Sequence, residues 1–354
     1  MELVHVDGSI GEGGGQVLRM ALAVSAITGR PVRVFNIRIK RSRPGLQHQH
    51  LTSVKALAAL TRAKVEGATL GSTELTFYPG SARGGDFTFD IGTAGSVTLL
   101  LQAIMPIMAL SREPMTVSVI GGTDVPKAPP IDYFRFVLRP LLSKLGFEYN
   151  INLVRRGHYP RGGGKVIVAT GGNAKLRPID LVSSGGLVRV NGLSHCVRLP
   201  SHVAVRQARA AEEALRDLNV PVKIELEYYE ANKDPHLGPG SGIVLWATTE
   251  RSVLGGDSLG ERGKPAEWVG REAARSLLDD LSTGMALDRH ASDMLLVYAA
   301  LSGGVSRLGG SALTSHAKTV IDLLNTILPE ASVKILQGFE GRPFIVEVRG
   351  SGLS

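Results

Sequence analysis

GGSALTSHAKTVIDLL, residues 309–324, joins a glycine-rich turn to an amphipathic segment. Apolar residues repeat at helical spacing from Val320 to Ile327, which predicts a helix over residues 314–328 with one face toward a core. The unpaired backbone N–H groups at a helix start favour an anion such as a phosphate. His316 lies at this start. A histidine in such a place is, on its own, more often a solvated surface residue than a nucleophile.

The same order of strand, polar or glycine- and proline-containing loop, and amphipathic helix recurs at residues 40–60 and 121–146. Each of these segments, like the one around His316, follows an earlier helix that comes after a loop of small residues. Those earlier helices are expected within residues 11–29, 92–110 and, less clearly, 288–304. We therefore predict an α/β (α+β) fold built from a unit of loop, helix, strand, loop, helix, strand and strand, repeated three times.

Residues 183–282 break this rhythm between the second and third units, and we expect an inserted αβ domain there. Period-two alternation predicts strands over 187–193, 222–230 and 242–250, and helical periodicity predicts helices over 203–218 and 265–281. The predicted main domain is then split. It takes residues 1–182, with units one and two and the start of unit three, and residues 283–354, with the rest of unit three.

Composition limits the classes of function. The 354 residues are 43% hydrophobic, which suits a globular protein with a large core. Cys196 is the single cysteine, so intramolecular disulfides and multi-cysteine zinc sites are excluded. The first residues lack the charged-then-apolar pattern of a secretion signal, and the apolar run 98–110 is too short to span a bilayer. We expect a cytoplasmic protein without a membrane segment.

A formal net charge of +8 favours anionic partners, although a modest basic excess is also common on proteins that bind nothing acidic. Two groups of cations are concentrated near loops. The first group is Arg38, Lys40, Arg41 and Arg43, and the second is Arg155, Arg156, Arg161 and Lys165. The first group could be a charged edge strand as readily as a binding site. The second group is interleaved with glycines, which let a backbone approach a phosphate closely.

Common nucleotide motifs are missing. GGGK at 162–165 is followed by Val166 instead of Ser or Thr, so it is not a P-loop, and GEGGGQ ends at Gln16 where a dinucleotide fingerprint needs glycine. His48 and His50 could ligate a metal, but a pair of this kind is more often a polar pair at a helix start.

RGHYPRGGGKV, residues 156–166, resembles the signature of the RNA 3′-terminal phosphate cyclase family. Further blocks in family order extend the resemblance over nearly the whole chain: residues 7–19, 41–56, 83–96 and 121–130, and the helix with Asp293. The resemblance implies three βαβαββ-type units, similar to the C-terminal domain of translation initiation factor three, plus one inserted αβ domain. It also implies ATP-dependent conversion of an RNA 3′-phosphate to a 2′,3′-cyclic phosphodiester, through a histidine–AMP adduct and an RNA adenylate.

The resemblance also implies residue roles. His316 matches the adenylylated histidine, and Glu12 matches an acid near the triphosphate and a divalent cation, Mg²⁺ or Mn²⁺. Asp293 matches an acid near the nucleotide. The other nucleotide-binding positions are Gln16, Arg19, Gln102, Pro129, Pro130 and His290, where the prolines would pack on the adenine and His290 replaces a stacking tyrosine. We expect contacts with RNA or its phosphates from Arg38, Arg41, Arg43, His50 and Arg161.

Structural alternatives exist for the two carboxylates, because Glu12 could cap a helix and Asp293 could be a solvated acid. Gln102 is a stronger clue from the residues alone, since an amide inside the apolar run TLLLQAIMPIM is costly unless it is bonded. The alternative function is a non-catalytic, cyclase-like RNA-binding protein of ribosome assembly, which lacks the nucleophilic histidine. His316 favours the catalytic branch, and we expect the insert to carry none of the chemistry.

Overall fold

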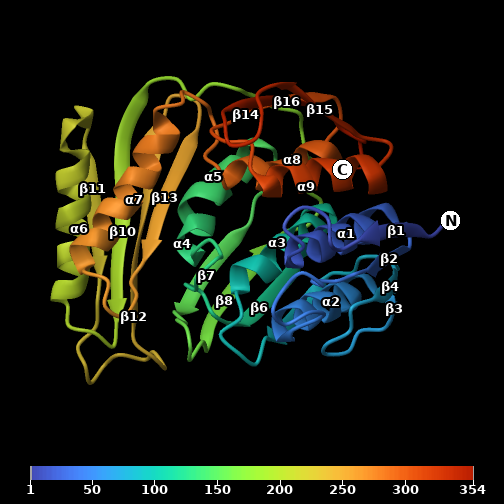
Figure 1. The fold of residues 1–354 in the computed structure, drawn as a ribbon, viewed down its shortest axis with the longest axis horizontal. Helices are drawn as coiled ribbons and strands as arrows, with labels where there is room; N and C mark the ends of the chain where they lie inside the picture. Colours follow the sequence, from blue (N-terminus) through green and yellow to red (C-terminus); the bar gives the residue numbers. More distant parts are fainter. Residues whose placement is uncertain (1, 354) are drawn as a thin grey trace.

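The computed structural model describes residues 2–353. It is a mixed α/β protein with four four-stranded sheets and helices packed between and against them (Figure 1). Three of the sheets share one pattern of pairing. In each, the strand that comes first in the chain is parallel to the second, the second is antiparallel to the fourth, and the fourth is antiparallel to the third.

The first of these sheets has the order β1-β2-β4-β3, and the second has the order β5-β6-β8-β7. The first contains β1 (Val4–Asp7), β2 (Val32–Phe35), β3 (Lys64–Glu66) and β4 (Leu75–Tyr78), with α1 (Gly15–Thr28) and α2 (His48–Thr61). The second contains β5 (Gly85–Asp90), β6 (Met115–Gly121), β7 (Asn150–Arg155) and β8 (Gly164–Thr170), with α3 (Val97–Leu110), α4 (Ile131–Tyr133), a π-helical turn η1 (Phe134–Leu138) and α5 (Arg139–Lys144).

The third sheet has the order β9-β14-β16-β15 and carries the stretch around His316. It contains β9 (Asp180–Leu181), β14 (Val305–Gly310), β15 (Ser332–Gln337) and β16 (Phe344–Arg349), with α8 (Ala291–Leu301) and α9 (Ser315–Ile327). The helix predicted over 314–328 is therefore confirmed. Its start is fixed locally, because the Thr314 side chain accepts a hydrogen bond from the Ala317 N–H.

The fourth sheet, of order β11-β10-β12-β13, comes between β9 and α8 in the chain. It contains β10 (Leu187–Val197), β11 (Val222–Glu227), β12 (Gly240–Thr249) and β13 (Val253–Leu259), with α6 (His202–Leu215), the turn η2 (Arg216–Leu218) and α7 (Ala266–Leu281). The strands and helices predicted here are present, but β13 was not predicted. Its centre is Gly255-Gly256, where side chains would collide with Tyr133 on one face and with α7 on the other.

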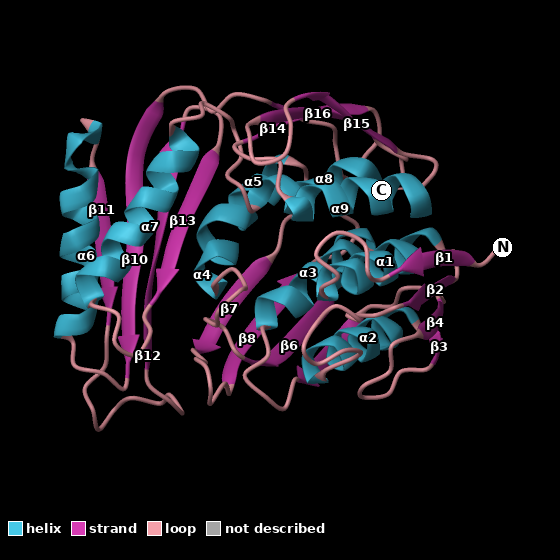
Figure 2. Ribbon diagram, in the orientation of Figure 1, coloured by secondary structure: helices cyan, strands magenta, loops and turns pink. Residues whose placement is uncertain are grey.

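The helices of the first three sheets pack on one another, with α1 against α2, α3 and α9 (Figure 2). These sheets and helices, which we call the body, share one large apolar core, and the fourth sheet has a smaller core of its own with α6 and α7. Within residues 2–353, no helix combines the length and apolar character that crossing a bilayer requires.

The two faces of the fourth sheet have different partners. Leu245 and Leu254 lie in the core with α6 and α7, whereas alternation turns Trp246 and Gly255 to the body. The Trp246 ring stacks on Phe136 of η1 at 4.3 Å between centroids. The chain crosses between the two parts twice, at neighbouring positions, where the Ser184 N–H donates to the Gly284 carbonyl at 3.0 Å.

Candidate active site

His316 lies in the first turn of α9, where the Thr314 cap and the Gln16 side chain fix the local backbone. Gln16, from α1, donates from Nε2 to the His316 carbonyl oxygen at 3.2 Å. The His316 side chain is about half exposed, at 47%. The imidazole is therefore held at a defined place on the surface, next to the start of α1.

Two carboxylates face the two ring nitrogens of His316. Glu12, in the loop before α1, brings Oε2 to 3.3 Å from Nε2. Asp293, in α8, brings Oδ2 to 4.0 Å from Nδ1. Residues about 300 positions apart in the chain are thus brought around one imidazole.

Glu12 is anchored by its neighbours. The Ser315 hydroxyl donates to Glu12 Oε1 at 2.8 Å, and Arg41 Nη2 lies 3.5 Å from Glu12 Oε2. The Ser315 hydrogen bond, followed by the proximity of His316 and Arg41, lowers the pKa of Glu12 despite some burial. Glu12 is therefore ionised at neutral pH.

Asp293 has the opposite environment. Burial raises the pKa of its carboxyl to about 6, although nearby His290 and His316 oppose the change. Asp293 Oδ1 is buried and has no hydrogen-bond partner among residues 2–353. Burial likewise lowers the pKa of Arg19 to about 10, against the attraction of Asp293. An incompletely satisfied carboxylate and a desolvated guanidinium are common at binding sites.

A cavity opens beside these groups. Its polar lining consists of Gln16, Arg19, Gln102 and Asp293, and the rest is apolar, including Met20, Met105, Phe134, Met294, Tyr298 and Val320. The structure therefore brings together seven of the predicted site residues by direct contact or a shared cavity wall. They are Glu12, Gln16, Arg19, Arg41, Gln102, Asp293 and His316.

His50, predicted to contact RNA, makes a hydrogen bond within the protein at the start of α2. Burial, with Arg19 and Arg38 nearby, lowers the pKa of His50 to about 3, so its ring is neutral. Its Nδ1 accepts the Gln47 N–H at 3.3 Å and caps α2. His48 is exposed in the same first turn, so this histidine pair is a polar pair at a helix start.

The loop before α2 holds the first basic group. The Arg38 guanidinium donates to the carbonyl oxygens of Arg43 and Gly45, at 2.7 and 2.8 Å, and stabilises the loop from inside. The Arg43 side chain is exposed. Of this group, Arg41 has the direct contact with the His316 site, through Glu12.

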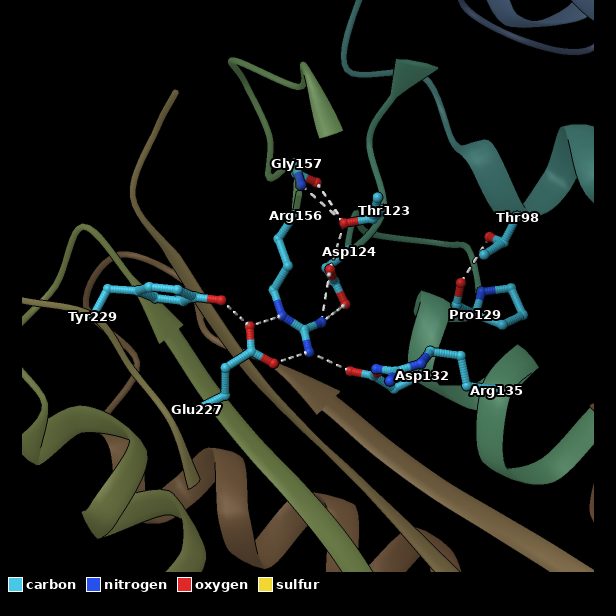
Figure 3. A network of polar contacts seen from close by, with 10 residues as sticks. All are labelled: Thr98, Thr123, Asp124, Pro129, Asp132, Arg135, Arg156, Gly157, Glu227 and Tyr229. Atoms are coloured by element: carbon cyan, nitrogen blue, oxygen red, sulfur yellow. Dashed lines mark hydrogen bonds and ion pairs between the residues drawn. The ribbon is translucent and has the colours of Figure 1, made fainter. Parts of the chain in front are cut away.

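The residues predicted to contact adenine lie just before the first residues of α4 and α8. The Pro129 carbonyl accepts from Thr98 Oγ1 at 2.7 Å (Figure 3). Pro130 directly precedes α4. His290 is exposed just before α8, and its ring meets Tyr133 edge-on at 6.1 Å. His290 is placed three residues before Asp293, on the same side of the helix.

The second basic group separates into different roles. Arg156 is fully buried, and its guanidinium pairs with Asp124, Asp132 and Glu227 (Figure 3). It joins the fourth sheet to the body and is not free to bind phosphate. Arg161 is exposed on the loop between β7 and β8. Its side chain lies beside Gly238. Within the described part of the chain, no hydrogen bond or ion pair links Arg161 to His316.

Some residues of the site escaped the sequence analysis. Ser315 orients Glu12, and its position directly before His316 was the available signal. Away from His316, Asp288 accepts from the Tyr133 hydroxyl at 2.7 Å, from the Gly255 N–H at 2.8 Å and from the Ala291 N–H at the start of α8. No local pattern marks Asp288, because its partners are distant in sequence.

A surface imidazole flanked by two carboxylates lies beside arginines and a partly apolar cavity, so these residues form a candidate active site. The family model described as RNA 3′-terminal phosphate cyclase matches residues 10–335. The chain belongs to the RNA 3′-terminal phosphate cyclase family.

Curated relatives with that same name align over nearly their whole length. The protein from Hyperthermus butylicus is 58% identical over 352 residues, covering 98% of each chain. The one from Ignicoccus hospitalis is 54% identical and covers 98% of this chain and 99% of its own. The one from Staphylothermus marinus is 52% identical and covers both completely. Among solved structures, EPSP synthase from Acinetobacter baumannii aligns with 99% of this chain and 66% of its own, at 11% identity and a TM-score of 0.30.

Proposed function

We propose that this protein uses ATP to convert the 3′-terminal phosphate of RNA into a 2′,3′-cyclic phosphodiester, with His316 as the residue that carries AMP. The observation that carries the proposal is the arrangement of His316 between Glu12 and Asp293, with its ring accessible. Membership of the cyclase family supports the overall reaction.

The two ring nitrogens have different surroundings. Nδ1 faces Asp293, and a carboxylate there orients the ring and stabilises a proton on Nδ1. Nε2 faces Glu12 and the arginine side of the site, where an incoming triphosphate finds positive charge. We assign Nε2 as the nucleophile and Asp293 as a positioning residue.

The chemistry proceeds in three displacements. The Nε2 lone pair attacks the α-phosphorus of ATP, and the bond from that phosphorus to the pyrophosphate oxygen breaks. An oxygen of the RNA 3′-phosphate then attacks the same phosphorus, and the P–N bond breaks to return the electron pair to Nε2. Finally the RNA 2′-hydroxyl attacks the 3′-phosphorus, loses its proton and expels AMP. The activation is needed because a phosphate monoester is a poor electrophile without a good leaving group.

A divalent cation fits the chemistry of Glu12. This carboxylate is ionised and half exposed, and Mg²⁺ is commonly held by one or two carboxylates together with substrate phosphates. Bound there, Mg²⁺ or Mn²⁺ would neutralise charge on the triphosphate. Arg41 and Arg19 add positive charge from the protein itself.

The cavity is suited to the nucleotide. Gln16, Arg19, Gln102 and Asp293 supply polar groups, and its methionine and aromatic walls supply apolar contact. We assign the adenine to the neighbourhood of Pro129, Pro130 and His290. The 3′ end of the RNA would approach along the loop before α2, which carries Arg41 and the exposed Arg43. Contacts with RNA phosphates would dominate its recognition.

We infer that the body is three copies of one βαβαββ unit and that residues 183–282 are an inserted domain. The shared pairing of the three sheets supports this division, as does the separate core of the fourth sheet. The insert begins after β9, so it interrupts the third unit. His316 and the six predicted site residues grouped with it all lie outside the insert.

A direct assay tests the activity. The protein is incubated with ATP, Mg²⁺ and an oligoribonucleotide with a fluorescent 5′ label and a 3′-phosphate. We expect the 3′-phosphate to become resistant to phosphatase, with ATP converted to AMP and pyrophosphate. An oligonucleotide with a 3′-hydroxyl is the control. A 3′ end that stays sensitive to phosphatase under all conditions would contradict the proposed function.

A further inference from the structure

A second cluster of chemically active side chains lies between the body and the fourth sheet. Asp124 follows β6, His158 follows β7, and His195 lies in β10. One potential ligand atom of each residue lies within 4.8 Å of those of the other two, and all three residues are buried. We propose that Asp124, His158 and His195 form a binding site for a zinc-like transition metal ion that joins the fourth sheet to the body.

The imidazoles offer ligand atoms that the protein leaves unused. His158 Nε2 and both ring nitrogens of His195 are buried without a hydrogen-bond partner among residues 2–353. Buried polar atoms are normally satisfied, so three such atoms in two adjacent rings require an explanation. The two ring centroids are 5.2 Å apart.

Each imidazole can supply one ligand atom. A neutral imidazole carries a lone pair on one ring nitrogen, and that lone pair can coordinate a metal ion. His158 has Nε2 free of hydrogen-bond partners among residues 2–353, and His195 has both ring nitrogens free.

The Asp124 carboxylate is held in place by hydrogen bonds and has an oxygen available as the third ligand. Its Oδ2 accepts from the Thr123 hydroxyl at 2.6 Å, and Arg156 Nη1 lies 3.3 Å from Oδ2 and 3.5 Å from Oδ1 (Figure 3). Among residues 2–353, Oδ1 therefore has one hydrogen-bond contact, which is long, and keeps lone pairs free. Hydrogen bonds from Thr123 and Arg156 would orient the carboxylate, as outer partners of metal ligands do.

The local charge tolerates a cation. Arg156 is surrounded by three carboxylates, those of Asp124, Asp132 and Glu227. Arg135 adds one further positive charge at Asp132. The group thus has an excess of negative charge beside two neutral histidines, which offsets the cost of a buried divalent ion.

The backbone is shaped around the two rings. A side chain at Gly240, at the start of β12, would overlap the His158 ring, and one at Gly242 would meet the His195 ring. The backbones of Asp124 and His158 pair as an isolated bridge. Ligands from both parts of the protein are thereby held at one point of their interface.

Two imidazole nitrogens and one carboxylate oxygen match Zn²⁺ better than Mg²⁺, which prefers oxygen ligands and retains water. Three protein ligands leave a fourth position for water. This site is separate from the proposed role of Glu12, so its test needs neither ATP nor RNA.

Untagged protein is freed of metals with a chelator and titrated with Zn²⁺ or Co²⁺ alone. We expect one high-affinity equivalent, visible absorption typical of four-coordinate Co²⁺, and a higher melting temperature with Zn²⁺. His158→Asn and His195→Asn should each weaken binding by about ten-fold or more. His202→Asn, at an exposed histidine of α6, and His316→Asn should leave it unchanged.

X-ray absorption at the zinc edge of the wild-type protein provides a measurement that does not depend on how the variants fold. Two imidazole ligands and no sulfur are expected. Absence of stoichiometric binding, unchanged affinity in both histidine variants, or a ligand shell of oxygens alone would overturn the proposal. Loss of binding in His316→Asn would place the ion at the other site and overturn it equally.

Discussion

Replacing Arg156 by methionine removes the guanidinium that joins the fourth sheet to the body, while it keeps an unbranched, apolar side chain. The Arg156 side chain is fully buried and reaches Asp132 at 2.6 Å, Glu227 at 2.7 Å and Asp124 at 3.3 Å. Burial alone would lower the pKa of Arg156, but these carboxylates hold it well above its usual value. The substitution leaves their negative charges without this partner.

The expected cost follows from that burial. Removing one partner of a buried ion pair costs about 3–5 kcal/mol, because the remaining charge is uncompensated. An unfolding entropy scaled to the 354 residues converts this into a melting temperature lower by roughly 4–7 °C. Arg156 holds the pKa of Glu227 low against the effect of burial, so the difference between the two proteins should shrink as the pH falls and Glu227 becomes protonated.

Calorimetry or near-ultraviolet circular dichroism measures the change, and Arg155→Met is the matched control. Arg155 is adjacent, but its Nε donates to a single carbonyl, that of Gly163, at 2.9 Å. Its loss should cost about 1 kcal/mol. If Arg156→Met melts within about 1 °C of Arg155→Met, the network contributes little and our account of how the fourth sheet is attached is wrong.

Three further predictions concern the candidate active site. Burial raises the folded-state pKa of Asp293 to about 6, so its negative charge should lower the stability of the folded protein above that pH and should have no such effect below about pH 4. In urea unfolding at pH 8, Asp293→Asn should therefore be more stable than the wild type by roughly 2–3 kcal/mol. A stability difference that does not change with pH would contradict this prediction. Glu12→Gln should slow enzyme labelling by α-labelled ATP about 10²-fold, with Ser315→Ala milder; equal rates for Glu12→Gln and wild type would exclude Glu12. Arg41→Ala should reduce cyclisation of unrelated 3′-phosphorylated oligonucleotides by similar factors and weaken its salt dependence, whereas loss for one base sequence alone would argue against phosphate contact.

Local patterns predicted the elements that local interactions determine. The helix at His316 was placed within one residue at each end, because its apolar spacing and the Thr314 cap are both encoded nearby. The strand β13 was missed because Gly255 and Gly256 interrupt its alternation. Side chains at these two positions would collide with Tyr133 and with α7, which are distant in the chain.

In the candidate site too, local sequence predicted some features, whereas contacts between distant segments could not be predicted. Gln102 could be singled out because an amide in an apolar helix is unusual, and the structure places it in the cavity wall. The basic group with Arg156 looked like a phosphate site from its glycines alone. Its acidic partners come from separate segments, and only the folded structure shows that they surround it. The contacts of Asp124, His158 and His195 were hidden for the same reason.

Labelling with ATP that carries the label in its α-phosphate tests the central claim most directly. The wild-type protein, His316→Asn and the control His48→Asn, at an exposed histidine of another helix start, are incubated with ATP and Mg²⁺, and adenylylated peptides are mapped by mass spectrometry. We expect AMP on His316 in the wild type and the control, an adduct that is labile to acid and stable to base, and no label in His316→Asn. AMP on Lys318, or an equally labelled His316→Asn protein, would remove His316 from the mechanism.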